Sequence, residues 1–137
     1  MRARARDLIE STLGGTPYLA RALELLALAE REAGDESCAV WTEHAGAVTA
    51  LGLVGLVAGA SGAGRIHLLL GHDSRLVASV CDVLRAMGAR FAMAEWPDDA
   101  PFAGAIGLLR DAGFAEEARI AGYYRPGVDQ VFLRRDL

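Results

Sequence analysis

The sequence has 137 residues, of which 53% are hydrophobic and 23% are charged, and its formal net charge at pH 7 is −4. This length and apolar content suit one domain, residues 1–137, with a buried core. The chain contains no Lys and is acidic overall, which argues against a nucleic-acid partner because phosphate binding needs clustered positive charge.

Two further features bear on localisation. The arginine-rich start, residues 2–6, is followed closely by Asp7 and Glu10, so we expect a solvated tail rather than a signal peptide. The longest apolar stretch, residues 47–60, is rich in Gly and Val and is shorter than the roughly 18 to 20 residues that a bilayer crossing needs. We therefore expect a cytoplasmic protein with no membrane partner.

The two cysteines give no sign of a metal site. Cys38 and Cys81 lie far apart and form no CxxC or Cys/His ligand pattern. We expect two reduced, buried thiols and no bound metal.

Two helices are predicted first along the chain. Residues 3–13 suit a short helix that the glycine pair 14–15 ends. A second helix is expected over residues 17–33, with Thr16 as its N-cap, a proline as its first residue and Gly34 as its stop. Its apolar residues recur at helical spacing, which predicts an amphipathic packing helix.

A meander of three antiparallel strands follows a turn at residues 35–37. A hairpin bend around Gly46 and a glycine-rich reversal at residues 60–64 separate the apolar runs. The expected strands are residues 38–45, 50–60 and 65–72.

The second half alternates helices and strands. Asp73 or Ser74 caps a helix that ends at Gly88, and apolar residues recur in it with a period of 3.6. A strand, a further helix and a final hairpin follow. The strand–helix–strand crossover implies at least one parallel pair in a largely antiparallel sheet, which is an α+β fold. The expected later elements are a strand at 89–96, a helix at 101–112 and hairpin strands at 118–124 and 128–135.

Several phrases resemble the GCN5-related N-acetyltransferase (GNAT) family. The run LLRDAGFAEEARIAGYYRPGVDQVFLRRDL, residues 108–137, carries the family's AGF triplet after a helix and a tyrosine-rich turn before the last strand. The resemblance extends upstream to Thr16, whereas residues 1–15 have no counterpart of the family's usual first strand. It implies a mixed sheet with a central parallel pair flanked by helices, and transfer of an acetyl group from acetyl-coenzyme A to an amine of a small molecule or peptide.

The resemblance also implies a place for the cofactor. Pantetheine lies between the parallel strands, and the diphosphate lies on backbone amides that open the following helix. The residues at these positions, and so the cofactor-binding candidates, are Leu70, Gly71, His72, Asp73, Ser74 and Arg75. If Arg75 is the first residue of the family's Arg/Gln-x-x-Gly-x-Gly/Ala motif, Ala78 and Val80 stand where glycines are expected.

The catalytic candidates are Glu95 and Tyr124. Glu95 ends its strand and suits an amine-binding or proton-accepting role, although a solvated strand-end carboxylate is an equally natural interpretation. Tyr124 suits an acceptor pocket, although paired aromatic residues also pack hairpins. Leu109 stands where many family members have the tyrosine that protonates the leaving thiolate.

Other chemically capable residues have plainer interpretations. We expect His72 to cap a strand and His67 to be a surface or core-edge residue, and Trp41 and Trp96 to lie in the core or a cleft wall. Two functions stay open: an N-acetyltransferase, and a catalytically silent ligand-binding or dimerisation module that keeps the fold. A missing first strand leaves a sheet edge exposed, which favours a homodimer.

Overall fold

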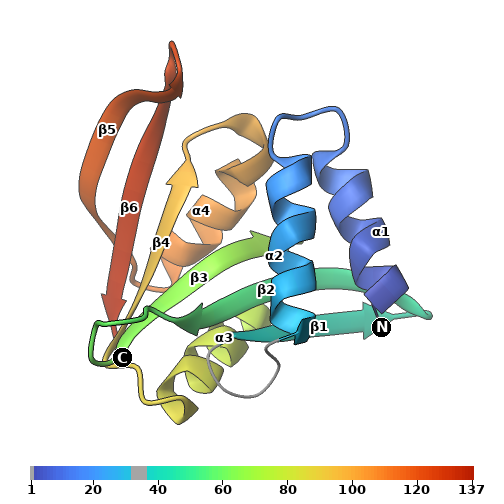
Figure 1. Ribbon diagram of the computed structural model, residues 1–137, viewed down its shortest axis with the longest axis horizontal. Coiled ribbons are helices and arrows are strands. Elements are labelled where there is room, and N and C mark those ends of the chain that lie inside the picture. The colour runs from blue at the N-terminus through green and yellow to red at the C-terminus, as the bar shows by residue number, and fades with distance from the viewer. Residues whose placement is uncertain (1, 32–36) are drawn as a thin grey trace.

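The computed structural model describes residues 2–31 and 37–137. Their strands form one six-stranded sheet in the order β1-β2-β3-β4-β6-β5, and all neighbours are antiparallel except the parallel pair β3–β4 (Figure 1). The α+β fold and the central parallel pair predicted from the sequence are therefore confirmed. The strands are β1 (Ser37–His44), β2 (Ala47–Leu56), β3 (Ala63–Leu70), β4 (Phe91–Pro97), β5 (Ala115–Arg125) and β6 (Val128–Asp136).

The helices cover both faces of this sheet. α1 (Arg2–Leu13) and α2 (Leu19–Arg31) pack together on one side of the first strands, as Figure 1 shows. α3 (Ser74–Ala86) contacts β1, β2 and α4 (Ala103–Asp111), which follows the 3₁₀ turn η1 (Ala100–Phe102). None of the helices in the described ranges is long and apolar enough to cross a bilayer.

The arginine-rich start is a packed helix, so the expected solvated tail is wrong. α1 begins at Arg2, and Ala5, Ile9 and Leu13 are completely buried. Residues four apart lie on one face of a helix, so these three apolar side chains form a stripe toward the core while Arg4 and Arg6 are exposed. Within residues 2–13 there is no strand, as the sequence indicated.

The second helix starts later than expected. Thr16 closes the turn after α1, because its Oγ1 donates to the Leu13 carbonyl at 2.6 Å and accepts from the Tyr18 amide at 3.3 Å. α2 therefore begins at Leu19, and Thr16 is not its N-cap. Gly34 and the turn at residues 35–36 lie outside the described residues.

β3 and β4 pair only at their first residues and then diverge. Their register covers Ala63–Arg65 against Phe91–Met93 and stops there, although both strands continue. At this point β3 contains an extra residue: Leu53 pairs with Leu68 and Val54 pairs with Ile66, so His67 is a β-bulge. A bulge increases local twist and bends its strand, which turns β3 away from β4.

Candidate functional site

A cavity of about 590 Å³ lies beside these diverging strands. Its volume is within the range of small-molecule sites in proteins. Segments far apart in the sequence build its wall: the end of α1, α2, β3, β4, η1 and the β5–β6 hairpin. The lining residues are Leu13, Pro17, Tyr18, Arg21, Ala22, Leu25, Arg65, Ile66, His67, Leu68, Glu95, Trp96, Pro97, Phe102, Tyr123, Tyr124, Arg125 and Gln130.

The indole of Trp96 joins the two strands where their ladder has ended. Trp96 is 3% exposed, and its Nε1 donates to the carbonyl oxygen of Ile66 at 3.0 Å. This bond satisfies the buried indole donor and a β3 carbonyl that lies beyond the end of the β3–β4 ladder. Trp96 is thus a cavity-wall residue, as expected, whereas Trp41 on β1 is 40% exposed and the expectation of a buried position is wrong for it.

An ion pair stands at the point of divergence. Arg65 Nη2 on β3 lies 3.0 Å from Glu95 Oε1 on β4, and both side chains are partly buried in the cavity wall. Arg65 Nε is buried and has no hydrogen-bond partner among the described residues. Glu95 therefore lines the cavity already paired with Arg65, and the Arg65 guanidinium has one donor, Nε, without a partner among the described residues.

His67 lies in the cavity wall, where the bulge places it. Burial, followed by the positive charges of Arg65 and Arg21, lowers the pKa of its imidazole from 6.5 to about 4. At neutral pH the ring is uncharged and offers one donor and one acceptor. The alternating pattern around His67 indicated a surface or core-edge residue and gave no sign of the bulge.

Aromatic rings form the opposite wall. Tyr18 makes edge-to-face contacts with Phe102 and Tyr124, with ring centroids 5.1 and 6.1 Å apart. Burial raises the pKa of Tyr124, so its phenol stays protonated at neutral pH, and its oxygen accepts a hydrogen bond from Gln130 at 3.4 Å. Tyr124 lines the cavity with Glu95, so the structure brings the two catalytic candidates to one site.

A polar triad ties this wall together. The Tyr18 hydroxyl donates to Asp99 Oδ2 at 2.7 Å, and Arg125 donates to the same oxygen at 2.8 Å and to the Tyr18 hydroxyl at 3.1 Å. These hydrogen bonds from Tyr18 and Arg125 lower the pKa of Asp99, so it is ionised at neutral pH. The triad connects the start of α2 with the turn of the β5–β6 hairpin.

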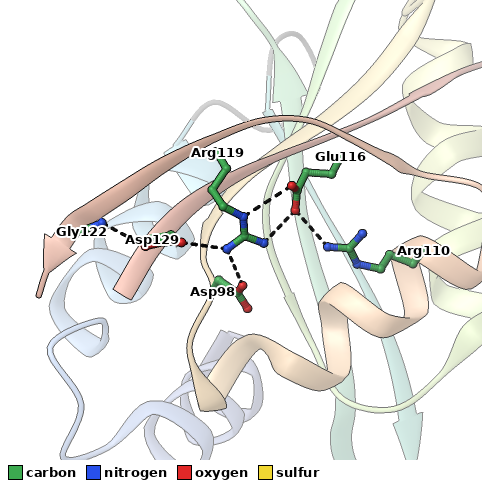
Figure 2. Close-up of polar contacts among 6 residues, drawn as sticks. All are labelled: Asp98, Arg110, Glu116, Arg119, Gly122 and Asp129. Atoms are coloured by element: carbon green, nitrogen blue, oxygen red, sulfur yellow. Dashed lines mark hydrogen bonds and ion pairs between the residues drawn. The ribbon is translucent and has the colours of Figure 1, made fainter. Parts of the chain in front are cut away.

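A second ionic cluster holds the exposed strand β5 in place, as Figure 2 shows. Arg119 lies 2.8 Å from Glu116, 2.8 Å from Asp98 and 3.0 Å from Asp129, and Arg110 of α4 also contacts Glu116. Every residue of β5 is exposed, so burial contributes little to its position. The cluster fastens β5 to α4, to β6 and to the end of β4, and so positions the tyrosines that enter the cavity.

The connection between β3 and α3 lies apart from the cavity. Asp73 accepts hydrogen bonds from the Arg75 amide at 3.0 Å, from Arg75 Nε at 3.2 Å and from the Thr42 hydroxyl at 3.2 Å, and its carbonyl accepts the Leu76 amide at 3.0 Å. These bonds lower the pKa of Asp73. None of the six cofactor-binding candidates, Leu70 to Arg75, lines the cavity.

Comparison with known proteins bears on the fold. No protein-family model matches the sequence, and no curated protein matches it. Among solved structures, a protein of Desulfovibrio desulfuricans assigned to the GNAT acetyltransferases has a TM-score of 0.81 at 23% identity, over 98% of this chain and 91% of that one. This chain has the GNAT fold.

Two more GNAT-fold structures match at similar coverage. The aminoglycoside 6′-N-acetyltransferase of Enterococcus faecium has a TM-score of 0.75 at 10% identity, over 98% of this chain and 89% of that one. An acetyltransferase of Salmonella typhimurium, solved with its cofactor acetyl-CoA, has a TM-score of 0.75 at 15% identity, over 99% of this chain and 88% of that one.

The residues that open α3 do not fit the diphosphate of coenzyme A. In this GNAT fold a carboxylate, Asp73, already caps the first turn of α3 and takes the Arg75 amide that an anion would need. Local packing alone explains the glycine at position 71, which has φ +93°, because a Cβ there would lie 2.5 Å from the Thr49 carbonyl oxygen. The His72 ring lies against Gly104 of α4, where a Cβ would come within 2.7 Å of it.

The position at which many family members have a proton-donating tyrosine also lacks a hydroxyl group. Leu109, which stands where many members have tyrosine, is completely buried in α4. The cavity residues that the sequence did not single out include Tyr18, Arg21, Arg65, Phe102, Arg125 and Gln130.

Proposed function

We propose that this GNAT-fold chain is a ligand-binding module that holds a small molecule in the cavity and makes no use of the diphosphate of coenzyme A. The observation that carries the proposal is the Asp73 carboxylate at the start of α3. The hydrogen bonds from Arg75 and Thr42 lower its pKa, so the carboxylate is ionised at neutral pH and repels a phosphate group. The cavity, by contrast, has apolar walls and a small number of convergent polar groups, which is typical of small-molecule sites.

The second candidate function is N-acetylation of an amine by acetyl-coenzyme A. Two observations favour it: the divergence of the parallel strands β3 and β4, and the Glu95 carboxylate beside that divergence. In this interpretation the amine of a small molecule or peptide enters the cavity beside Glu95 and Tyr124.

Calorimetric titration with acetyl-coenzyme A and with coenzyme A separates the two functions. We expect no binding of either compound up to millimolar concentration. Micromolar binding of either one overturns the proposal and supports the acetyltransferase.

A pair of variants tests the physical reason. Asp73→Ser keeps a capping hydroxyl but removes the charge, and Asp82→Ser removes an exposed charge from the same helix as the control. A rise in coenzyme A affinity in Asp73→Ser and not in Asp82→Ser identifies the carboxylate as the obstacle. Equal behaviour of both variants contradicts this reason.

The homodimer expected from the sequence stays a proposal. β1 and β5 are the outer strands of the sheet, and outer strands present unpaired backbone groups to partner chains. Sedimentation velocity at several concentrations tests it, and a monomer at all of them contradicts it.

A further inference from the structure

We propose that the ligand of the cavity is an organic carboxylate with an apolar body, whose carboxylate binds between Arg21 and Arg65. This inference rests on the proposed function, since it names the ligand class of the same cavity. It excludes a simple cationic amine as the preferred ligand.

The charges that line the cavity carry the inference. Among the described lining residues there are three guanidinium groups, on Arg21, Arg65 and Arg125, and one carboxylate, on Glu95. The lining therefore carries more positive than negative charge, although Glu24 and Asp99 outside it pair with Arg21 and Arg125 and the whole chain has a net charge of −4. A site of this sign attracts anions and repels ammonium groups.

The existing ion pairs show which of these charges are available. Glu95 is engaged by Arg65 at 3.0 Å, and Arg125 is engaged by Asp99 at 2.8 Å. Glu95 is thus already neutralised as a partner for an incoming amine. The Arg65 side chain is 34% exposed beside the cavity, so its guanidinium can meet a ligand, whereas its unpartnered Nε is buried.

Arg21 supplies the second positive group. Its side chain and that of its partner Glu24 are both about two-thirds exposed, at 69% and 67%. Exposed pairs of this kind contribute little stability, so the guanidinium of Arg21 can turn to a ligand carboxylate at small cost. Burial is the main cause of the lowered pKa of His67, and the positive charges of Arg65 and Arg21 lower it further.

The remaining wall fits an apolar body. Leu13, Ala22, Leu25, Ile66 and Leu68 line the cavity with the rings of Trp96 and Phe102. Aromatic and aliphatic walls of this kind bind flat apolar groups by burial and edge contacts.

The test compares 3-phenylpropanoate with phenethylamine, which have the same apolar body and opposite charge. Binding is followed in nitrogen–proton correlation spectra by the indole signals of the two tryptophans, because Trp96 lines the cavity and Trp41 does not. We expect 3-phenylpropanoate to shift the Trp96 signal with saturation, to leave the Trp41 signal in place, and to bind at least tenfold more tightly than phenethylamine. Phenethylamine binding as tightly, or no saturable shift of the Trp96 signal with either compound, overturns the inference.

Two variants on one helix locate the carboxylate. Arg21→Gln removes a cavity charge, and Arg31→Gln removes an exposed charge from the end of α2, outside the cavity. We expect Arg21→Gln to weaken 3-phenylpropanoate binding about tenfold, which corresponds to about 1.4 kcal/mol. Arg31→Gln should stay within about twofold of the parent chain, because a charge outside the cavity is largely screened by salt. Equal affinities of the two variants overturn the inference.

The two proposals fail separately. If phenethylamine alone binds in the cavity, the carboxylate inference fails and the ligand-binding proposal stands. If coenzyme A binds at micromolar strength, the ligand-binding proposal fails, whether or not 3-phenylpropanoate binds.

Discussion

Trp96 Nε1 and the carbonyl oxygen of Ile66 are joined by a buried hydrogen bond of 3.0 Å, which connects β4 to β3 after their parallel ladder has stopped. This bond links the two strands in the cavity wall, at a point where their backbones no longer pair.

Replacing Trp96 by Phe tests its contribution. The variant keeps an aromatic ring but leaves the Ile66 carbonyl without its donor, and an unsatisfied buried acceptor costs about 1–3 kcal/mol. We expect the free energy of unfolding, measured in urea, to fall by about that amount or more, because the smaller ring also leaves a void. Trp41→Phe, on the exposed outer strand, is the control and should change it by less than about 0.5 kcal/mol.

Two glycines of α4 give a matched pair. Gly107 has open space where a Cβ would lie, so Gly107→Ala should stabilise the fold by about 0.5–1 kcal/mol through helix propensity. Gly104→Ala gains the same propensity, but its Cβ meets His72 Cε1 at 2.7 Å, so we expect it to be less stable than Gly107→Ala. The double variant Gly104→Ala with His72→Ala should recover the difference in thermal unfolding; a failure to recover contradicts the contact.

His67 makes stability depend on pH. Its folded pKa of about 4 lies below its ordinary value of 6.5, so the fold favours the neutral ring. The stability that depends on the neutral ring is complete above pH 6.5, declines as the pH falls toward 4 and is lost below it, a change of up to about 3 kcal/mol. Unfolding measured across this window should lose that slope in His67→Gln and keep it in His44→Gln, where the histidine is exposed.

The Arg119 cluster predicts local mobility of the hairpin. Arg119→Ala removes three ion pairs from a strand whose residues are all exposed, so β5 loses its ionic links to Asp98 at the end of β4 and to Asp129 of β6. Amide hydrogen exchange should accelerate in residues 115–125 and stay unchanged in α3. Arg85→Ala removes the exposed Arg85–Asp82 pair of α3 and is the control; equal protection of β5 in both variants contradicts the role of the cluster.

The sequence predicted the fold well because its signals are local. Val77, Val80 and Leu84 recur on one face of α3 and are all buried, and a strand–helix–strand crossover gives a parallel pair by chain geometry alone. The helix expected over residues 3–13 is confirmed, whereas the solvated tail expected at residues 2–6 is wrong because Ala5 begins the buried stripe that Ile9 and Leu13 continue at four-residue spacing.

The cavity was harder to predict because its parts meet only in three dimensions. The Tyr18–Asp99 and Arg125–Tyr18 bonds join residues 81 and 107 positions apart, and no motif spans such intervals. The bulge at His67 depends on the register of β2 against β3, which alternation within β3 does not reveal. Asp73 was recognised both as an N-cap and as a cofactor-binding candidate, and the structure places its carboxylate in the capping role.

The connection from β3 to α3 has a consequence for redesign. β3 ends at Leu70 and α3 begins at Ser74, so the chain crosses from sheet to helix through Gly71, His72 and Asp73 alone. These residues are held by the Thr49 backbone, by Gly104 and by the Arg75 amide respectively. Gly71 cannot be replaced without moving the Thr49 backbone, whereas Asp73 holds its place through side-chain hydrogen bonds, so engineering of coenzyme A affinity into this protein should begin at Asp73.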